Sequence, residues 1–479
     1  MIDKMFIGGR FVEASTRETF PSLNPATGEV IGQVPRGGKA DVDRAVAEAQ
    51  AARAGEWGRM SALERGRVLM RIAQRILDDA EELAQLEALD TGKPLTTARN
   101  DIQVLARYFE FYGSAADKVH GEVIPFLNGY TVNLLREPLG VTAHIVPWNY
   151  PAQMIGRSVA PALAMGNAAV LKPAEDTSYS ALYIARIAQQ AGLPDGALNV
   201  VTGLGEEAGA ALASHPDIDF ISFTGSNEVG TLIQTAAAHT PVKCVLELGG
   251  KSPQIVFDDA DLERAVPVIV RAIVQNAGQT CTAGSRLLVQ ESIYDVCVSR
   301  VAEAFARVKV GTPDMDLDCG PLMNAAQRTR VQRYIDDARA AGVPVLAEGS
   351  LADGLPAGGF FVRPVMFGPV APDAVLAQDE VFGPVLSVIP FRDEAHAVAI
   401  ANGTPYGLIA AVWTENGGRQ QRMARAVRAG QVFINSYGAG GGVELPFGGT
   451  RRSGHGREKG LLALEEVSTT KTVIQFHGE

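Results

Sequence analysis

The sequence lacks the features that mark membrane, secreted and nucleic-acid-binding proteins. No uninterrupted apolar run approaches the ~18 residues of a membrane-spanning helix. The segment MIDKMFIGGRFVEAS has an acid at Asp3 and no long apolar core, which disfavours a signal peptide. Lys and Arg number 43 against 54 Asp and Glu, a net charge of −11, and no basic run stands out. We therefore expect a cytoplasmic protein that binds neither membrane nor nucleic acid.

Cysteine is scarce, and its spacing disfavours the common metal and redox motifs. The four cysteines are Cys244, Cys281, Cys297 and Cys319, and no CxxC pair occurs, so we expect no metal site and no thioredoxin-type motif. A reducing compartment keeps such thiols free. We interpret three of them as small buried residues. Cys281 differs because it lies in NAGQTCTAGSR, among small, polar and flexible neighbours.

A thiol in such a loop is a candidate nucleophile, because backbone N–H groups favour the reactive thiolate. The seven histidines are scattered outside any motif, which disfavours a Cys–His hydrolase. Glu247 ends a strand-like run before two glycines, where a carboxylate is costly unless it has a function or a partner. The sequence therefore favours Glu247 as a base that activates the thiol or a water molecule.

The first part of the chain is predicted to be helical. The segment DVDRAVAEAQAAR begins with Asp41 as the expected N-cap. A longer helical stretch opens with Ser61 and Glu64 as a capping box and ends at Gly92. The alternating segment Tyr130–Pro138 then predicts an extended strand, one half of a protruding hairpin.

From position 141 onward, short apolar runs alternate with amphipathic helices, which predicts a parallel, doubly wound sheet. A second alternation follows between positions 253 and 435. Because 479 residues exceed one ordinary core, the expected fold class is α/β with two such domains. The runs of the first sheet are Val141–Val146, Ala168–Lys172, Leu198–Val201, Phe220–Phe223 and Val245–Leu248.

Ligands of such sheets bind beyond the carboxyl ends of the strands. The polar residues expected there are Trp148, Asn149, Lys172, Glu175, Thr224, Gly225, Ser226 and Glu247. The amide of Asn149 could donate to an oxyanion or stabilise the turn before Pro151. Ser226 opens a helix whose free N–H groups suit a phosphate. Glu175 suits ribose hydroxyls and would repel a 2′-phosphate, although its segment could also be a solvated helix start.

Eight motifs, taken in order, resemble those of the aldehyde dehydrogenase superfamily. They are PWNYP (147–151), LKPAE (171–175), FTGS (223–226), LELGGKSP (246–253), GQTC (278–281), EVFGPV (380–385), FIN (433–435) and PFGGTRRSGHGRE (446–458). The resemblance spans nearly the whole chain. It implies hydrolytic, NAD(P)+-dependent oxidation of an aldehyde to a carboxylic acid, and Glu175 favours NAD over NADP.

The resemblance implies a role for each matching residue. Cys281 matches the nucleophile that forms a thiohemiacetal and then a thioester, and Asn149 matches the oxyanion donor. Glu247 matches the base that activates the hydrolytic water. The matching cofactor contacts are Trp148, Lys172, Glu175, Gly225, Ser226, Glu380 and Phe382. The residues expected near the substrate are Tyr150, Arg157, Thr280 and Gly440.

The architecture of the family implies an NAD-binding domain at 1–118 and 139–250 and a catalytic domain at 251–448. A bridging and oligomerisation segment would comprise 119–138 and 449–479. The stretches YTVNLLREP and STTKTVIQF fit two strands of that segment. Because an exposed strand edge invites pairing with another subunit, we expect a homodimer or a homotetramer.

Two features bear on the substrate. The segment SYGAGGGVEL has glycines where related enzymes often carry an aromatic residue, so we expect a site open to bulky, aromatic or medium-chain aldehydes. Arg157 matches an arginine that can grip the carboxylate of succinic semialdehyde, which makes a semialdehyde the alternative, unless Arg157 is a structural helix residue. A CoA-acylating enzyme, a cysteine esterase and a catalytically silent binding protein also remain open.

Overall fold

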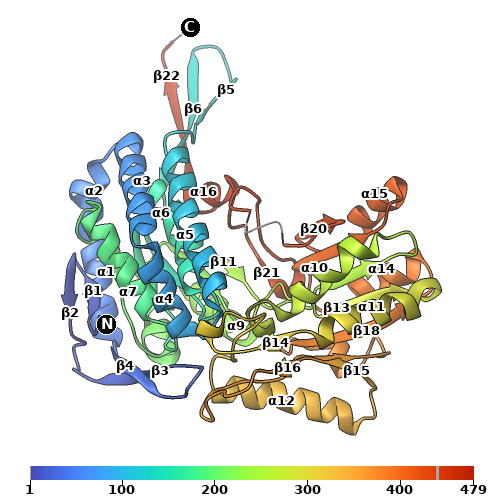
Figure 1. The fold of residues 1–479 in the computed structure, drawn as a ribbon. Coiled ribbons are helices and arrows are strands. Elements are labelled where there is room, and N and C mark those ends of the chain that lie inside the picture. The colour runs from blue at the N-terminus through green and yellow to red at the C-terminus, as the bar shows by residue number, and fades with distance from the viewer. Residues whose placement is uncertain (1, 439–441, 479) are drawn as a thin grey trace.

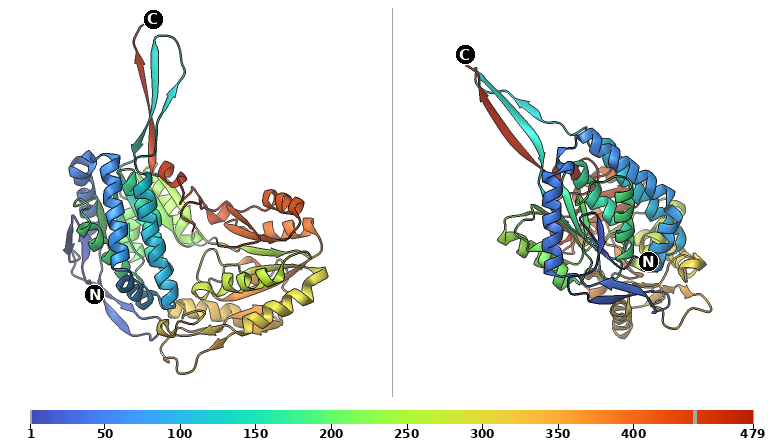
Figure 2. Two further views of the ribbon diagram at one scale, coloured as in Figure 1. Left: turned by 45° about the horizontal axis from the view of Figure 1, so that its top comes forward. Right: turned by 90° about the vertical axis from the view of Figure 1, so that its left-hand side faces the viewer.

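Two α/β units and a projecting β-arm make up residues 2–438 and 442–478, which the computed structural model describes. Figure 1 shows the unit built from the N-terminal half beside the unit built from the C-terminal half. The arm extends away from both units in every view, with the C-terminus near its tip (Figures 1 and 2). This arrangement confirms the expected fold class of two doubly wound α/β domains with a small β-extension.

The first sheet has the strand order β2-β1-β9-β8-β7-β10-β11-β21. Its five central strands are parallel, as their apolar runs predict, and the residues of β7 and β8 are all buried because helices cover the sheet. The central strands are β7 (Val141–Ile145), β8 (Ala168–Lys172), β9 (Leu198–Val200), β10 (Phe220–Thr224) and β11 (Lys243–Glu247). The accompanying helices are α6 (Pro151–Ala164), α7 (Tyr179–Gln190), α8 (Ala210–Ala213) and α9 (Asn227–His239).

The N-terminal segment differs from its predicted helical character. Strands β1 (Met5–Ile7) and β2 (Arg10–Val12) extend the edge of the first sheet in antiparallel fashion. Strands β3 (Thr19–Leu23) and β4 (Val30–Pro35) form a separate hairpin. These strands are short, and β3 contains a proline and mostly unburied residues, so no apolar alternation marked them.

Helix α1 (Lys39–Ala54) begins before the predicted N-cap. Gly38 holds the N-cap position, and Asp41 lies inside the first turn, where its carboxylate accepts a hydrogen bond of 3.1 Å from the Gly38 N–H. The acid therefore caps the helix from position N3, so the prediction of Asp41 as the N-cap was wrong by one turn.

The predicted capping box of Ser61 and Glu64 is confirmed at the start of α3 (Ala62–Asp78). The stretch then breaks at Asp79, and α4 (Ala80–Thr91) ends at Gly92, which adopts φ 76°. Helix α5 (Leu95–Ala115) follows and packs against α3 and α6. The predicted single helical stretch is therefore two helices, and α2 (Glu56–Arg59) precedes them.

The second sheet has the strand order β15-β17-β18-β13-β12-β19-β20 and is parallel except for β15. Its strands are β12 (Pro253–Val256), β13 (Arg286–Gln290), β15 (Val345–Glu348), β17 (Val365–Phe367), β18 (Val385–Phe391), β19 (Ile409–Trp413) and β20 (Gln431–Ile434), and β14 (Lys309–Val310) pairs β16 (Ser350–Leu351) beside it. The helices are α10 (Leu262–Val274), α11 (Tyr294–Ala306), α12 (Ala325–Ala340), α13 (Val375–Gln378), α14 (Glu394–Asn402) and α15 (Gly417–Ala426).

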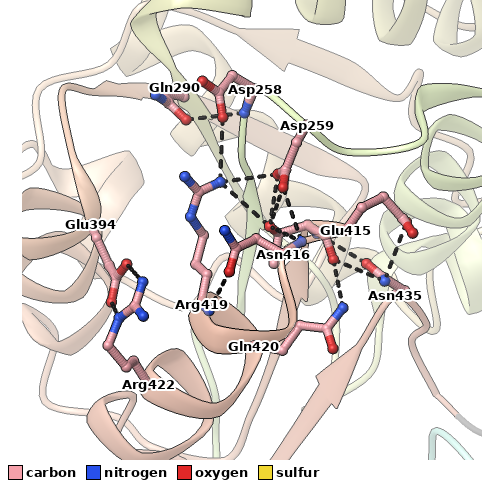
Figure 3. Close-up of polar contacts among 11 residues, drawn as sticks. Asp258, Asp259, Gln290, Glu394, Glu415, Asn416, Arg419, Gln420, Arg422 and Asn435 are labelled. Atoms are coloured by element: carbon pink, nitrogen blue, oxygen red, sulfur yellow. Dashed lines mark hydrogen bonds and ion pairs between the residues drawn. The ribbon is translucent and has the colours of Figure 1, made fainter.

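A polar network joins the carboxyl ends of β12, β19 and β20 (Figure 3). The hydroxyl of Thr414, after β19, donates to Asp259, after β12. Asn435, after β20, accepts a 3.0 Å hydrogen bond from the Thr414 N–H. Arg419, in α15, bonds to Asp259 at 3.0 Å, and Asn416 caps the same helix. The carboxyl edge of the second sheet is therefore occupied by side chains of the chain itself.

The arm is a three-stranded antiparallel sheet of order β22-β6-β5. Strand β6 (Tyr130–Pro138) pairs along its whole length with β22 (Ser468–Phe476) and on its other side with β5 (Glu122–Ile124). Both β6 and β22 have the bounds predicted from the sequence. Helix α16 (Leu462–Glu466) leads into β22, and β21 (Gly454–His455) pairs with β11 of the first sheet. The domain boundaries given above stay a prediction.

No helix within residues 2–438 and 442–478 is long and apolar enough to cross a membrane.

Candidate active site

The candidate site lies where the two sheets present opposite edges to each other. From the first sheet come residues beyond the carboxyl ends of β7 and β11, among them Asn149 and Glu247. From the second sheet come residues before the amino ends of β13 and β18, among them Cys281 and Glu380. The site therefore follows the strand-end rule on one side only, since Cys281 and Glu380 precede their strands, whereas the carboxyl ends of β12, β19 and β20 hold the network of Figure 3.

Cys281 follows a strained turn. Asn276, Ala277 and Gly278 have φ values of 51°, 53° and 73°, so three successive residues are left-handed. Such strain persists only when surrounding contacts hold it. The side-chain amide of Asn276 donates to the backbone carbonyl of Asn149 at 2.9 Å. The side-chain oxygen of Gln279 accepts a hydrogen bond from the Met323 N–H at 2.8 Å. These contacts fix the backbone that carries the thiol.

A close approach of two chain segments holds Cys281 in place. A Cβ atom on Gly250 would lie 2.3 Å from the Cys281 carbonyl oxygen, a distance that no side chain tolerates. The glycine pair after Glu247 therefore lets this segment pass directly beside the nucleophile loop. Position 250 therefore requires glycine because there is no room for a Cβ atom, and not because the backbone adopts a positive φ.

The Cys281 side chain is half-buried in an apolar cluster. It packs with Phe433 and Tyr437 against Phe447, Leu408 and Ile409. Burial raises the pKa of the thiol to about 12; Arg157 opposes this shift, and Glu380 and Glu247 add to it. The thiol is therefore neutral at ordinary pH and needs a base to remove its proton.

Asn149 is buried, and contacts on both sides fix its orientation. Its side-chain amide donates to the Gln279 carbonyl at 2.9 Å, two residues before Cys281. Its own carbonyl accepts hydrogen bonds from Lys93 Nζ at 3.2 Å and from the amide of Asn276. The amide nitrogen is thus directed toward the nucleophile loop, as an oxyanion donor requires.

Glu247 ends β11 and is buried. Burial raises the pKa of its carboxyl to about 8, an effect that the neighbouring Arg157 cation reduces and Glu458 increases. Arg157 Nη2 lies 3.2 Å from Glu247 Oε2. The carboxyl also influences the Cys281 thiol electrostatically, so the structure brings the predicted base and the predicted nucleophile into one site.

Arg157 projects from α6 into the same site and is fully engaged there. Its guanidinium forms ion pairs with Glu247 and with Glu458, whose other oxygen accepts from the Ser222 hydroxyl at 3.0 Å. It also stacks on Phe447, with Cζ 4.3 Å from the ring centroid. Arg157 was a candidate for binding a substrate carboxylate. In the structure it instead forms ion pairs with two carboxylates of the protein.

The predicted cofactor contacts in the first sheet lie along one edge. Lys172 ends β8 and reaches Glu175, with Nζ 3.0 Å from Oε2. Gly225 follows β10 and donates its N–H to the Glu247 carbonyl at 3.0 Å. Ser226 is the N-cap of α9, where its hydroxyl accepts from the Val229 N–H at 3.3 Å. The remaining N–H groups of the first turn of α9 stay available for an anion.

The predicted cofactor contacts in the second sheet lie opposite that edge. The carboxylate of Glu380 accepts a 2.8 Å hydrogen bond from the Gly250 N–H, and burial raises its pKa to about 7. The ring of Phe382 meets Trp148 edge to face, with centroids 5.4 Å apart. Residues from both sheets therefore flank the same space.

The remaining predicted substrate residues have different surroundings. Tyr150 is buried and its hydroxyl accepts from the amide of Gln275 at 2.9 Å. The Thr280 hydroxyl lies 3.0 Å from that of Thr282. Gly440 lies in segment 439–441, outside the described residues. Tyr437, a described residue before that segment, donates to the Thr282 carbonyl at 2.6 Å and packs in the same apolar cluster as Cys281.

Sequence reasoning passed over several residues of the site. Lys93 is fully buried and bonds to Asp101 at 2.5 Å and to Glu87 at 3.2 Å, directly behind Asn149. Phe447 and Glu458 lie in the PFGGTRRSGHGRE motif, which could have drawn attention to them. No local signal marked Lys93, because its partners lie in other turns of the helical region. Within the described ranges, no His, Cys, Asp and Glu side chains are grouped as a metal site.

Comparisons of the sequence and of the fold with known proteins all identify the same family. The model of the aldehyde dehydrogenase family matches residues 11–473. The chain is 44% identical to aldehyde dehydrogenase family 2 member B4, mitochondrial, of Arabidopsis thaliana, over 98% of this chain and 88% of that protein. A solved protein from Burkholderia cenocepacia is 57% identical, with a TM-score of 0.98 over 99% of this chain and 100% of that one. An indole-3-acetaldehyde dehydrogenase complexed with NAD+ is 40% identical, with a TM-score of 0.96 over 99% and 96%.

Proposed function

Because the chain belongs to the aldehyde dehydrogenase family, we propose that Cys281, Asn149 and Glu247 are its catalytic residues. The protein is an enzyme that oxidises aldehydes with a nicotinamide cofactor. The geometry above supports the assignment of the three residues, since they come from distant parts of the chain and meet at the facing sheet edges. The observation that carries it is the half-buried thiol on a loop that the Asn149 amide contacts at the Gln279 carbonyl, within the electrostatic influence of the Glu247 carboxyl.

In the first step, Cys281 Sγ bonds to the aldehyde carbon and forms a thiohemiacetal. The thiol proton passes to Glu247, directly or through water, because the raised thiol pKa leaves little thiolate at rest. The side-chain amide of Asn149 and the Cys281 N–H donate to the oxygen that becomes negatively charged. A nicotinamide dinucleotide held beside Glu380 and Phe382 would supply the acceptor for the hydride that leaves this carbon, and Cys281 then carries the acyl group as a thioester. Glu247 then releases the proton of the thiol to solvent.

In the second step, Glu247 takes a proton from water as the water oxygen bonds to the thioester carbon, and it passes this proton to the departing sulfur. The carbon–sulfur bond breaks, the thiol of Cys281 returns, and the carboxylic acid leaves. This hydrolytic ending distinguishes the proposal from a CoA-acylating enzyme, in which an added thiol takes the acyl group. Addition of CoA should therefore leave the product unchanged.

The residues present fit a nicotinamide dinucleotide. The open turn at the start of α9, capped by Ser226, suits the pyrophosphate. Glu175 is partly exposed beside the buried Lys172 and suits ribose hydroxyls, and this carboxylate supports a preference for NAD over NADP. Glu380 and Phe382, opposite, would hold the nicotinamide ribose and ring.

The test is NADH formation in three variants. Cys281→Ala should abolish it, whereas Cys244→Ser, a change at another thiol, should leave it intact. Glu247→Gln lacks the base of both steps, so it should release its first equivalent of NADH more slowly and lower steady turnover ~10²–10⁴-fold. Steady aldehyde oxidation by Cys281→Ala would refute the assignment, and turnover without any nucleotide would favour the esterase alternative.

For the substrate, we propose a bulky, aromatic or medium-chain aldehyde. The apolar cluster of Phe433, Tyr437 and Phe447 around the Cys281 side chain supports it, because such rings hold an apolar group beside the thiol. Similarity to an indole-3-acetaldehyde dehydrogenase adds support. A panel of benzaldehyde, hexanal, betaine aldehyde and succinic semialdehyde, ranked by kcat/KM, tests the proposal.

A semialdehyde is the second candidate, and one observation favours it. Lys459 Nζ lies 5.2 Å from the Phe447 centroid, and burial lowers its pKa to about 7, so near neutral pH part of the Lys459 amine is charged beside the ring that packs with Cys281. If succinic semialdehyde leads the panel, Lys459→Met should raise its KM and leave that of hexanal unchanged.

For assembly and location, we propose a homodimer or homotetramer in the cytoplasm. The arm supports assembly, because β5, β6 and β22 expose apolar side chains far from the two α/β units, including Val123, Ile474 and Phe476. The four unpaired cysteines support a reducing compartment.

A further inference from the structure

We propose that Arg157 is a positioning residue that divides its charge between Glu247 and Glu458 and so sets how much of Glu247 is available as a base. The proposal rests on the proposed function, in which Glu247 activates the hydrolytic water. It gives Arg157 a role other than gripping the substrate.

The contacts that carry the proposal are all buried. Arg157 Nη2 lies 3.2 Å from Glu247 Oε2, and Arg157 Nε forms an ion pair with Glu458 Oε2. Glu458 Oε1 accepts from the hydroxyl of Ser222 on β10 at 3.0 Å. Phe447 covers the guanidinium plane at 4.3 Å. The cation is therefore held between two carboxylates, and of these two Glu247 is the one whose charge acts on the Cys281 thiol.

Glu247 experiences charges from several elements. Arg157 of α6 and Arg457 of the 456–460 loop stabilise its carboxylate, whereas burial and Glu458 of the same loop oppose it. The Glu247 charge acts in turn on two neighbours, since it raises the pKa of both Cys281 and Lys459. Because an isolated buried carboxyl would be neutral near pH 7, the Arg157 contact is what keeps part of Glu247 ionised.

The arrangement makes a signed prediction, since the two partners of Arg157 act on Glu247 in opposite directions. Arg157→Gln removes the stabilising cation, so the ionisation midpoint of Glu247 should move to higher pH. Glu458→Gln removes a competing anion but keeps the shape of the side chain, so the midpoint should move to lower pH. Simple damage to the fold would not move the two variants apart.

The measurement is decay of the acyl-enzyme, which isolates the step that Glu247 serves. Treatment with p-nitrophenyl acetate acetylates Cys281 without the cofactor, and intact mass follows loss of the acetyl group from about pH 6 to about pH 10. We expect the midpoint to rise by about one pH unit or more in Arg157→Gln and to fall by about one in Glu458→Gln.

Two further variants complete the design. Arg157→Lys keeps the charge and should stay near the wild-type midpoint, and it tests the proposal with Glu458→Gln if Arg157→Gln does not fold. Arg99→Gln removes an arginine from an exposed ion pair and should change nothing. Unchanged midpoints, or shifts of the same sign in Arg157→Gln and Glu458→Gln, would overturn the proposal.

The same experiment gives a different outcome if the proposed function itself is wrong. If the wild-type enzyme forms no acetyl adduct on Cys281, or if Glu247→Gln loses the acetyl group as fast as the wild type, then the nucleophile or base assignment is wrong. The role of Arg157 is refuted only when the adduct forms, its decay depends on Glu247, and the midpoints do not separate.

Discussion

At the residue scale, burial controls the chemistry of the ionisable groups in the site. Cys281, Glu247 and Glu380 all have raised pKa values, and burial is the largest cause for each. A raised pKa increases the neutral fraction of an acidic group, and the effect is largest for the thiol, whose pKa rises to about 12. The free enzyme therefore holds an unreactive thiol, and its reactivity depends on proton transfer within the site.

The raised thiol pKa predicts how Cys281 reacts with iodoacetamide. A thiolate is the attacking species, so the alkylation rate should keep rising about tenfold per pH unit beyond pH 9, where a free cysteine of pKa ~8.5 would level off. Peptide mass spectrometry at each pH measures the rate, and Cys281→Ala gives the background. A plateau below pH 9 would contradict the raised pKa.

Replacement of Lys93, which lies behind the site, is expected to lower the stability of the fold strongly. Its ammonium lies fully buried between Asp101 and Glu87, and these two anions outweigh burial and keep its pKa above the usual value. Lys93→Met should destabilise the fold by about 3–5 kcal/mol, because it leaves the carboxylates uncompensated. Thermal denaturation measures the loss. Lys39→Met, which breaks an exposed pair with Asp43, should change the melting temperature little.

The site residues could be predicted from the sequence only where a local pattern marked them. Cys281 stood out by its neighbours, and Asn149 and Glu247 by their places after strand-like runs. The partners of Arg157 could not be found this way, because Glu458 is distant in sequence and meets it only through the pairing of β21 with β11. The identity of an ion-pair partner depends on tertiary packing, which composition and spacing do not describe.

At the element scale, buried parallel strands were the most predictable feature. Runs such as Ala168–Lys172 are buried throughout, and apolar up to the final lysine, because helices cover the sheet. Helix α12 (Ala325–Ala340) was not predicted, because only Val331, Ile335 and Ala338 of it are buried and the rest is polar. Elements at the surface or at a sheet edge have a weak apolar pattern in the sequence, so only the structure reveals them.

The turn between β11 and β12 gives a prediction at this scale. Gly250→Ala would place a Cβ atom 2.3 Å from the Cys281 carbonyl, so the nucleophile loop must move. A shift of about 1 Å in a reacting atom can cost ~10²-fold in rate, so kcat should fall to that extent. Gly417→Ala, at a glycine with no atom within 4 Å of the added Cβ, is the control. Equal activity of both variants would show that the loop adapts freely.

At the scale of the whole molecule, the two sheets contribute unlike edges to one site. The helix end proposed to bind phosphate and the proposed base come from the carboxyl edge of the first sheet, and the proposed nucleophile comes from the amino edge of the second. At the carboxyl ends of β12, β19 and β20 in the second sheet, Asp259, Asn416 and Asn435 instead bond to other residues of the protein (Figure 3). The strand-end rule could not reveal this division, since it treats every parallel sheet alike.

The arm predicts how the molecule assembles. Ile474 and Phe476 of β22 are 62% and 63% exposed, on a sheet that projects from both α/β units (Figure 2). Apolar side chains so exposed mark an interaction surface, and the edge of β22 is open to pairing. Changing both residues to Lys should lower the mass measured by light scattering toward that of one chain, 50.7 kDa.

The control for assembly is an equally exposed apolar residue elsewhere. Val375, at the start of α13, is 61% exposed, and Val375→Lys should leave the mass unchanged. Because the changed side chains of β22 already face solvent in one chain, a fall in mass with retained circular dichroism reports lost contacts between chains and not unfolding. If the Ile474 and Phe476 variant keeps the wild-type mass, the subunits associate through another surface, and the arm must owe its apolar face to some other contact.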